Sequence, residues 1–250
     1  MGHVIAVAGK GGTGKTTIAA LIIRLLKESK RCSLLAIDAD PNSNLGESLG
    51  VETKQTIGSL LDEIAKHPDE IPSGMTKDRF IEFQVQSIIS EAEGFDILSM
   101  GKPEGPGCYC YVNNVLRGVL SKLVSNYDYV VIDNEAGLEH LSRRTARQVD
   151  SLVIISDPTV VGLKAASRID KLTKELEIKI KNKFLLINRA NETFDQKKAS
   201  EIGAKLLGQI PNDEQIYKIS LNGSSLLQLS QEAVSLRALV KIGEKIWQNN

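Results

Sequence analysis

One glycine-rich segment near the beginning of the chain constrains its fold most strongly: Gly9–Thr17, with the sequence GKGGTGKTT. It follows an apolar run at residues 4–8 and precedes a run at residues 18–26 with a helical pattern. The spacing G-x-x-x-x-G-K-[ST] between a strand and a helix is typical of a phosphate-binding loop. The segment therefore predicts binding of a nucleoside triphosphate. The alternative is a glycine-rich turn without a ligand.

Each residue type in this loop suits phosphate binding. Glycines let backbone N–H groups converge on phosphate oxygens, and the N-terminus of the following helix adds partial positive charge. Lys15 can reach the β- and γ-phosphates, and the hydroxyl of Thr16 can ligate Mg²⁺. The residues expected to bind the nucleotide here are Gly9, Gly11, Gly12, Thr13, Gly14, Lys15, Thr16 and Thr17.

Bulk properties favour a soluble, cytoplasmic, single-domain protein spanning residues 1–250. The chain is 42% hydrophobic and 25% charged, which is ordinary for a globular protein. Its 31 basic and 31 acidic residues give a formal net charge of zero, which argues against a general nucleic-acid or anionic-membrane surface. The sequence shows no secretory signal and no apolar run near the ~18 residues of a membrane span. Its three cysteines do not form a disulfide framework.

Apolar runs alternate with helical patterns along the whole chain. Strands are expected at residues 4–8, 33–37, 95–100, 129–132, 152–155, 184–187 and 206–210. Further helices are expected at residues 56–66, 112–124, 162–177, 196–203, 213–219 and 231–247, and residues 79–89 fit a helix slightly better than a strand. Continuously apolar strands are buried on both faces. The pattern predicts an α/β fold with a doubly wound, mostly parallel sheet and helices on both faces.

Three aspartates follow expected strands and so fall at the same edge of the sheet as the glycine-rich loop. Asp133 has the position of an acidic residue that holds the hydration shell of Mg²⁺. Asp38 and Asp40 are two residues apart, and one could support Mg²⁺ or Thr16 while the other orients the attacking water. The alternative is that these aspartates only cap turns. Slow, gated hydrolysis is the expectation.

Lys10 gives the loop a second lysine, which phosphate binding does not require. This resembles the phosphate loop of the family that includes MinD, ParA and the nitrogenase iron protein. The resemblance extends to Asp38-Ala-Asp40-Pro and to Asp133–Gly137, which are similar to the two switch segments of that family. It implies an ATPase that uses ATP/ADP with Mg²⁺ and forms a sandwich homodimer, in which Lys10 reaches the phosphates of the partner. The alternative is a solvated loop lysine.

Two further segments are similar to parts of this family. Asn188-Arg189 resembles the pair whose asparagine recognises adenine. Cys108-Tyr-Cys110 resembles the cysteine pair of CooC-type ATPases, which mature nickel-containing carbon monoxide dehydrogenase. That resemblance implies that Cys108 and Cys110 of two subunits hold one Ni²⁺ or Zn²⁺ per dimer, and that the partner is the apo-enzyme. The second cluster-ligating cysteine of the iron protein corresponds to Ala136, so an iron-protein-type cluster is not supported.

The chemistry of the thiolates agrees with a shared site. A closed soft-metal site needs about four ligands, and two-fold symmetry doubles two thiolates to four. A Cys108–Cys110 disulfide would be strained and out of place in a reducing cytoplasm, and two unligated loop cysteines are the other alternative. We interpret Cys32 as a core residue that begins a buried strand, and the three histidines as structural or solvated.

Three classes of function fit these sequence features. The first is a dimerising ATPase that gates metal delivery, most consistent with Ni²⁺, into carbon monoxide dehydrogenase. The second is a MinD/ParA-like spatial-organisation ATPase, for which residues 234–247 are the candidate membrane helix, although a helix packed on the sheet is favoured. The third is an iron–sulfur scaffold or reductase that uses the same thiolates. We expect no nucleic-acid partner and no stable membrane association.

Overall fold

The structure is a computed structural model of the chain. It describes residues 2–29, 32–101, 110–135, 148–176, 178–190, 194 and 196–247. For residues 110–117 it describes the backbone alone. The predicted cysteine Cys108 therefore lies outside the described residues, and so does His140.

Eight strands form one sheet within the described residues, in the order β3-β4-β2-β5-β1-β6-β7-β8. These strands are β1 (His3–Gly9), β2 (Leu34–Ala39), β3 (Ser90–Ala92), β4 (Phe95–Ser99), β5 (Tyr129–Asn134), β6 (Gln148–Ser156), β7 (Lys179–Asn188) and β8 (Lys205–Ile210). Every neighbouring pair is parallel except β3 and β4, which pair antiparallel. The predicted doubly wound, mostly parallel sheet is confirmed, and the carboxyl ends of seven strands share one edge.

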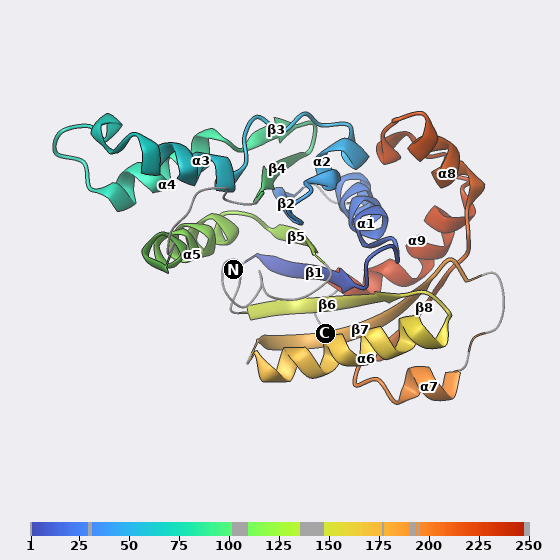
Figure 1. The fold of residues 1–250 in the computed structure, drawn as a ribbon. Coiled ribbons are helices and arrows are strands. Elements are labelled where there is room, and N and C mark those ends of the chain that lie inside the picture. Colours follow the sequence, from blue (N-terminus) through green and yellow to red (C-terminus); the bar gives the residue numbers. More distant parts are fainter. Residues whose placement is uncertain are drawn as a thin grey trace.

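Helices cover both faces of this sheet (Figure 1). One face carries α1 (Lys15–Ser29), α2 (Asn44–Leu49), α8 (Glu214–Leu221), the 3₁₀ helix η3 (Leu226–Gln228) and α9 (Val234–Trp247). The other face carries α3 (Ile57–Lys66), the 3₁₀ helix η1 (Pro68–Glu70), α4 (Lys77–Ser87), α5 (Cys110–Ser125), α6 (Val160–Glu175) and α7 (Gln196–Ser200). The ambiguous segment 79–89 is mostly helical, as α4, which agrees with the slightly better helical fit of its apolar spacing.

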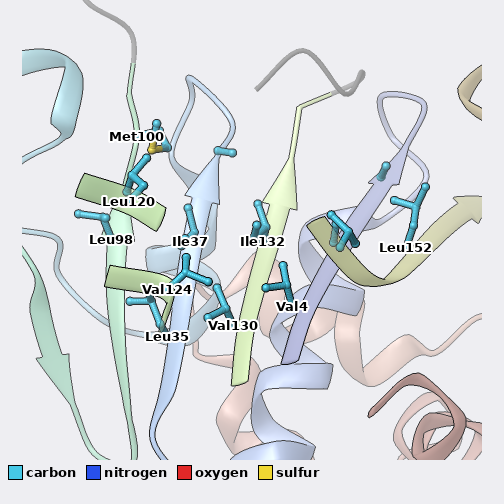
Figure 2. Close-up of a cluster of buried hydrophobic side chains, with 14 of the residues drawn as sticks. Val4, Leu35, Ile37, Leu98, Met100, Leu120, Val124, Val130, Ile132 and Leu152 are labelled. Atoms are coloured by element: carbon cyan, nitrogen blue, oxygen red, sulfur yellow. The ribbon is translucent and has the colours of Figure 1, made fainter. Parts of the chain in front are cut away.

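Two apolar layers hold the helices to the sheet. Figure 2 shows one of them, where Leu120 and Val124 of α5 belong to the same cluster as Ile37 and Ile132 of the central strands. The central strands β1, β2 and β5 are buried along almost their whole length, as their continuous apolar runs predict. Burial of apolar surface stabilises such layers by roughly 25 cal/mol per Å². The sheet is therefore packed on both faces beneath the residues at its carboxyl edge.

Three local features differ from the sequence-based expectation. Helix α2 was not predicted, because it has only six residues and contains a glycine, Gly46. Strand β3 was not predicted, because its three residues lack an apolar pattern. Cys32 is half-buried and precedes β2, so its interpretation as a core residue that begins the strand was wrong.

The C-terminal helix α9 packs with its apolar side on the sheet. Leu236, Leu239 and Ile246 are each fully buried. The carbonyl of Ile246 accepts hydrogen bonds from the hydroxyl of Ser151 and from the ring of His3, which lies within β1. The favoured packed helix is thus what the structure shows. Across the described residues, no helix combines the length and the apolar character needed to cross a membrane.

Candidate functional site

The glycine-rich loop joins the end of β1 at Gly9 to the start of α1 at Lys15. Gly12 and Gly14 have φ angles of +80° and +89°, which are strained for residues with a side chain. A Cβ atom at Gly14 would lie 2.4 Å from Nδ2 of Asn188, and one at Gly9 would lie 2.5 Å from the carbonyl oxygen of Ile155. A side chain at Gly9 or Gly14 would therefore clash with its neighbours.

The Thr16 hydroxyl lies directly against Asp133. Its Oγ1 donates a 2.6 Å hydrogen bond to Oδ2 of Asp133, whose side chain is 1% exposed. The other carboxylate oxygen, Oδ1, is buried and has no hydrogen-bond partner among the described residues. An unpaired buried acceptor is costly, so it suits a position where a cation or its hydration shell binds. The residues present therefore fit Mg²⁺ held by Thr16 and, through water, by Asp133.

Burial also changes the acidity of Asp133. Desolvation raises its pKa to about 7, against the lowering effects of the hydrogen bond from Thr16 and of the charge on Lys15. Lys15 itself is 8% exposed at the first residue of α1. A charged lysine and an unpaired carboxylate oxygen thus occur together at the head of α1, where the helix dipole favours anions such as phosphate.

Asp38 stands beside Asp133 on the neighbouring strand, and the two are register partners in the sheet. Its Oδ1 accepts a 3.1 Å hydrogen bond from the backbone of Asp40, and its Oδ2 accepts a 2.8 Å bond from the backbone of Leu45. Complete burial raises its pKa to about 6. The carboxylate of Asp38 therefore anchors the whole turn from β2 into α2.

Asp40 has a different environment, since it lies beyond the end of β2 and is half-buried. Its Oδ1 accepts 2.9 Å hydrogen bonds from the backbone and the side-chain amide of Asn42. This is the turn-capping geometry that was the alternative to a catalytic role for this residue. The structure places Asp38 beside Asp133, which bonds Thr16, whereas Asp40 is bonded within its own loop.

Asn188 and Arg189 at the end of β7 contact the glycine-rich loop. The side-chain amide of Asn188 donates a 2.8 Å hydrogen bond to the carbonyl of Thr13, and the guanidinium of Arg189 donates a 3.1 Å bond to the carbonyl of Gly12. Asn188 is 6% exposed. Both predicted nucleotide-binding residues therefore lie at the loop, although the β7 strand is separated from β1 by β6.

Lys10 is exposed, and its ammonium group has no ion-pair partner among the described residues. Its backbone carbonyl accepts hydrogen bonds from the backbone and hydroxyl of Thr13, which fix the first half of the loop. The loop thus holds the backbone of Lys10 in place while its charge faces solvent.

The structure does not describe the side chains of the predicted metal ligands. Cys108 lies outside the described residues, and Cys110 is the first residue of α5, with its side chain among those that are not described. Among the described side chains, no group of three or more histidine, cysteine, aspartate or glutamate residues is arranged to hold a metal ion. The metal site therefore stays a prediction.

Sequence reasoning missed two features next to the loop. Asn134 is 1% exposed, and its amide donates a 3.0 Å hydrogen bond to the carbonyl of Val7, which ties β5 to β1 one residue after Asp133. A pocket of about 600 Å³ lies between α2 and α8, and Thr17, Glu47 and Ser220 are among its lining residues. No sequence signal could have found it, because its walls come from segments about 170 residues apart.

Comparison with known proteins places the chain in a family. The model of the CobQ/CobB/MinD/ParA nucleotide binding domain matches residues 4–226. The chain belongs to this family, and it is a MinD/ParA-family ATPase.

Several individual proteins are similar to it. An uncharacterized ATP-binding protein of Methanocaldococcus jannaschii is 43% identical over 97% of this chain and 98% of its own. The carbon monoxide dehydrogenase accessory protein CooC of Rhodospirillum rubrum is 34% identical over 90% of each chain. Among solved structures, the septum site-determining protein MinD of Pyrococcus horikoshii, complexed with Mg-ADP, has a TM-score of 0.71 at 23% identity, and covers 99% of this chain and 97% of its own. This last likeness shows the fold.

Proposed function

We propose that this chain is a dimeric ATPase that assists nickel insertion into carbon monoxide dehydrogenase, with nucleotide and metal binding coupled through the dimer. The observation that carries the proposal is the Cys108-x-Cys110 pair in a chain 34% identical to CooC over 90% of both lengths. The phosphate loop, the Thr16–Asp133 pair and Lys10 supply the nucleotide half. The Cys-x-Cys pair supplies the metal half.

In the nucleotide half, backbone N–H groups of residues 9–17 and the ammonium of Lys15 bind the phosphates. Thr16 and Asp133 hold Mg²⁺, which neutralises charge on the phosphates. Asp38 and Asp40 position the attacking water and the first switch. The base of the nucleotide binds beside Asn188 and Arg189. Lys10 of each subunit reaches the phosphates that are bound to the other subunit.

The metal half is supported by the backbone position of Cys110. It is the first residue of the 16-residue helix α5. Thiols at helix N-termini generally ionise more readily, because the helix dipole stabilises the thiolate, and the thiolate is the form that binds metals. Cys108 and Cys110 of one chain supply two thiolates, so a four-ligand site for Ni²⁺ or Zn²⁺ requires a second chain related by two-fold symmetry.

The experiment that tests this function is size measurement with metal analysis. Wild type is compared with Cys108→Ala/Cys110→Ala and with the control Cys32→Ala, in apo, ADP and ATP states with Ni²⁺ or Zn²⁺. We expect wild type and the control to dimerise with one metal ion per two chains, and the double variant to bind none. Identical dimerisation of all three proteins contradicts metal gating.

The same preparation discriminates the other two classes. A brown protein with broad absorbance near ~400 nm after anaerobic purification favours an iron–sulfur scaffold or reductase. Sedimentation with liposomes or DNA in the presence of ATP favours a MinD/ParA-like spatial role. Against membrane binding stands the buried apolar side of α9, which is already packed on the sheet.

A further inference from the structure

Asn188, the last residue of β7, and Arg189, which follows it, bond two successive carbonyls of the phosphate loop. Asn188 bonds the carbonyl of Thr13 at 2.8 Å, and Arg189 bonds the carbonyl of Gly12 at 3.1 Å. The bond from Asn188 is buried, since Thr13 is 2% exposed and Asn188 is 6% exposed. Both bonds join atoms of the protein itself, a side chain to a loop carbonyl in each case.

The backbone at Arg189 is set up for this contact. Its φ angle is +55°, which a residue with a side chain adopts at a cost of about 1 kcal/mol or more. Successive side chains of a regular strand point to opposite faces. The left-handed turn at Arg189 breaks that alternation, and both side chains reach the same loop. The next residue fixes the turn, because the N–H of Ala190 bonds the carbonyl of Ile210 at 3.0 Å.

The orientation of the bonded carbonyls matters for phosphate binding. In a trans peptide, C=O and N–H point in opposite directions. A bond that holds the Thr13 carbonyl on the side of β7 therefore directs the N–H of Gly14 to the other side. Gly12 and Gly14 both have positive φ angles, and a glycine backbone can adopt many other conformations. Without the bonds from Asn188 and Arg189, the peptides between these two glycines could therefore take other orientations.

The neighbouring peptide is held at both ends. The carbonyl of Gly12 accepts from Arg189, and the N–H of Thr13 donates to the carbonyl of Lys10 at 3.3 Å. The Thr13 hydroxyl adds a 2.8 Å bond to the same Lys10 carbonyl. In this segment the Gly14 N–H is thus directed away from β7, and the peptide that precedes it is fixed.

We propose that Asn188 and Arg189 are positioning residues that lock the phosphate loop in its anion-binding form, independently of any contact with a base. This inference rests on the proposed nucleotide binding and adds to it. The ligand that it concerns is the triphosphate group alone. A residue that acts only on the base leaves binding of inorganic tripolyphosphate unchanged, whereas a residue that positions the loop weakens it.

The test is calorimetric titration of wild type, Asn188→Ala and Arg189→Asn with Mg-ATP and with magnesium tripolyphosphate. Asparagine tolerates a positive φ, so Arg189→Asn removes the guanidinium and keeps the turn. Arg237→Asn removes an exposed arginine that pairs with Glu232, and serves as the control for lost charge. High ionic strength screens general electrostatic attraction, so the loss of affinity that remains under this condition reports the lost hydrogen bond.

We expect Asn188→Ala to weaken both ligands by about 10-fold and Arg189→Asn by about 3-fold, as loss of one hydrogen bond predicts, with no change in Arg237→Asn. Weaker binding of ATP with unchanged binding of tripolyphosphate overturns the inference, and so does unchanged binding of both. If Asn188→Ala does not fold, the exposed Arg189→Asn variant decides the question by the same two criteria. If wild type binds neither ligand, the proposed function fails instead.

Discussion

The backbone carbonyl of Asp38 accepts a 2.8 Å hydrogen bond from the backbone N–H of Met100. The carbonyl of Met100 in turn accepts a 2.8 Å bond from the N–H of Gly58 in the first turn of α3. Gly101 follows with a φ of +58°, and a Cβ atom there would lie 2.4 Å from Oγ1 of Thr56, the N-cap of α3. The segment that precedes Cys108 in the sequence is thus hydrogen-bonded to β2, the strand that carries Asp38.

We expect Gly101→Ala to weaken the dependence of Ni²⁺ affinity on nucleotide state, because the added methyl group forces Met100 or Thr56 to shift. It should also destabilise the protein by about 1–3 kcal/mol. The measurement is Ni²⁺ titration with ATP and with ADP, beside denaturant unfolding. Gly74→Ala is the matched control, since Gly74 has a φ of +84° but no atom near its missing Cβ. Equal effects of the two substitutions on Ni²⁺ coupling contradict the link.

Asp133→Asn tests the proposed Mg²⁺ site. The substitution removes the charge that supports the cation next to Thr16, and residues in this supporting position typically change metal affinity by about 10- to 100-fold. We expect a loss of that size in Mg²⁺ affinity of the nucleotide complex, measured by magnesium titration of nucleotide binding. Thr16→Ser keeps the hydroxyl and should bind Mg²⁺ like wild type. A Mg²⁺ affinity unaffected by Asp133→Asn removes Asp133 from the site.

The raised pKa values give the apo protein a specific dependence on pH. Asp133 has a pKa of about 7 and Asp38 of about 6, compared with about 3.9 in an unfolded chain. The folded state therefore binds more protons than the unfolded state between about pH 4 and pH 7, so this contribution to stability is present at low pH and is lost as pH rises.

Other carboxylates oppose this trend. Desolvation raises the pKa values of Asp150 and Asp213, but their hydrogen bonds outweigh it and the net pKa shift of each is downward. The informative quantity is therefore the difference between wild type and Asp133→Asn. Denaturant unfolding without Mg²⁺ should show that the variant gains stability relative to wild type between pH 4 and pH 8, by an amount of the order of a few kcal/mol. Parallel profiles for the two proteins would show that Asp133 titrates normally.

Lys10→Ala separates dimerisation from binding. The Lys10 side chain is exposed, so its loss should change the free energy of unfolding by less than about 0.5 kcal/mol. ATP-dependent dimer formation should be lost, while nucleotide binding by the monomer persists. Lys15→Ala should instead weaken nucleotide binding itself. Light scattering and nucleotide titration check both, and a Lys10→Ala variant that still dimerises with ATP refutes the role across the interface.

The sequence predicts those parts of the fold and site that depend on local pattern. Apolar runs gave the central strands, and the order of strands and helices brought Asp38, Asp133 and Asn188 to one edge of the sheet. It could not predict that the carboxylate of Asp38 bonds Leu45, or that Arg189 adopts a positive φ. Those features depend on tertiary packing between segments, and periodicity carries no information about them.

The most direct test of the account is reciprocity between metal binding and dimer formation. If both thiolate pairs meet only in the dimer, the factor by which ATP-driven dimerisation tightens Ni²⁺ binding must equal the factor by which Ni²⁺ tightens the dimer. The measurement is the Ni²⁺ dissociation constant in monomer and dimer, beside the dimer dissociation constant with and without Ni²⁺. We predict equal factors above one in wild type, and a dimer dissociation constant of Cys108→Ala/Cys110→Ala that Ni²⁺ does not change. A factor of one in wild type would contradict the account.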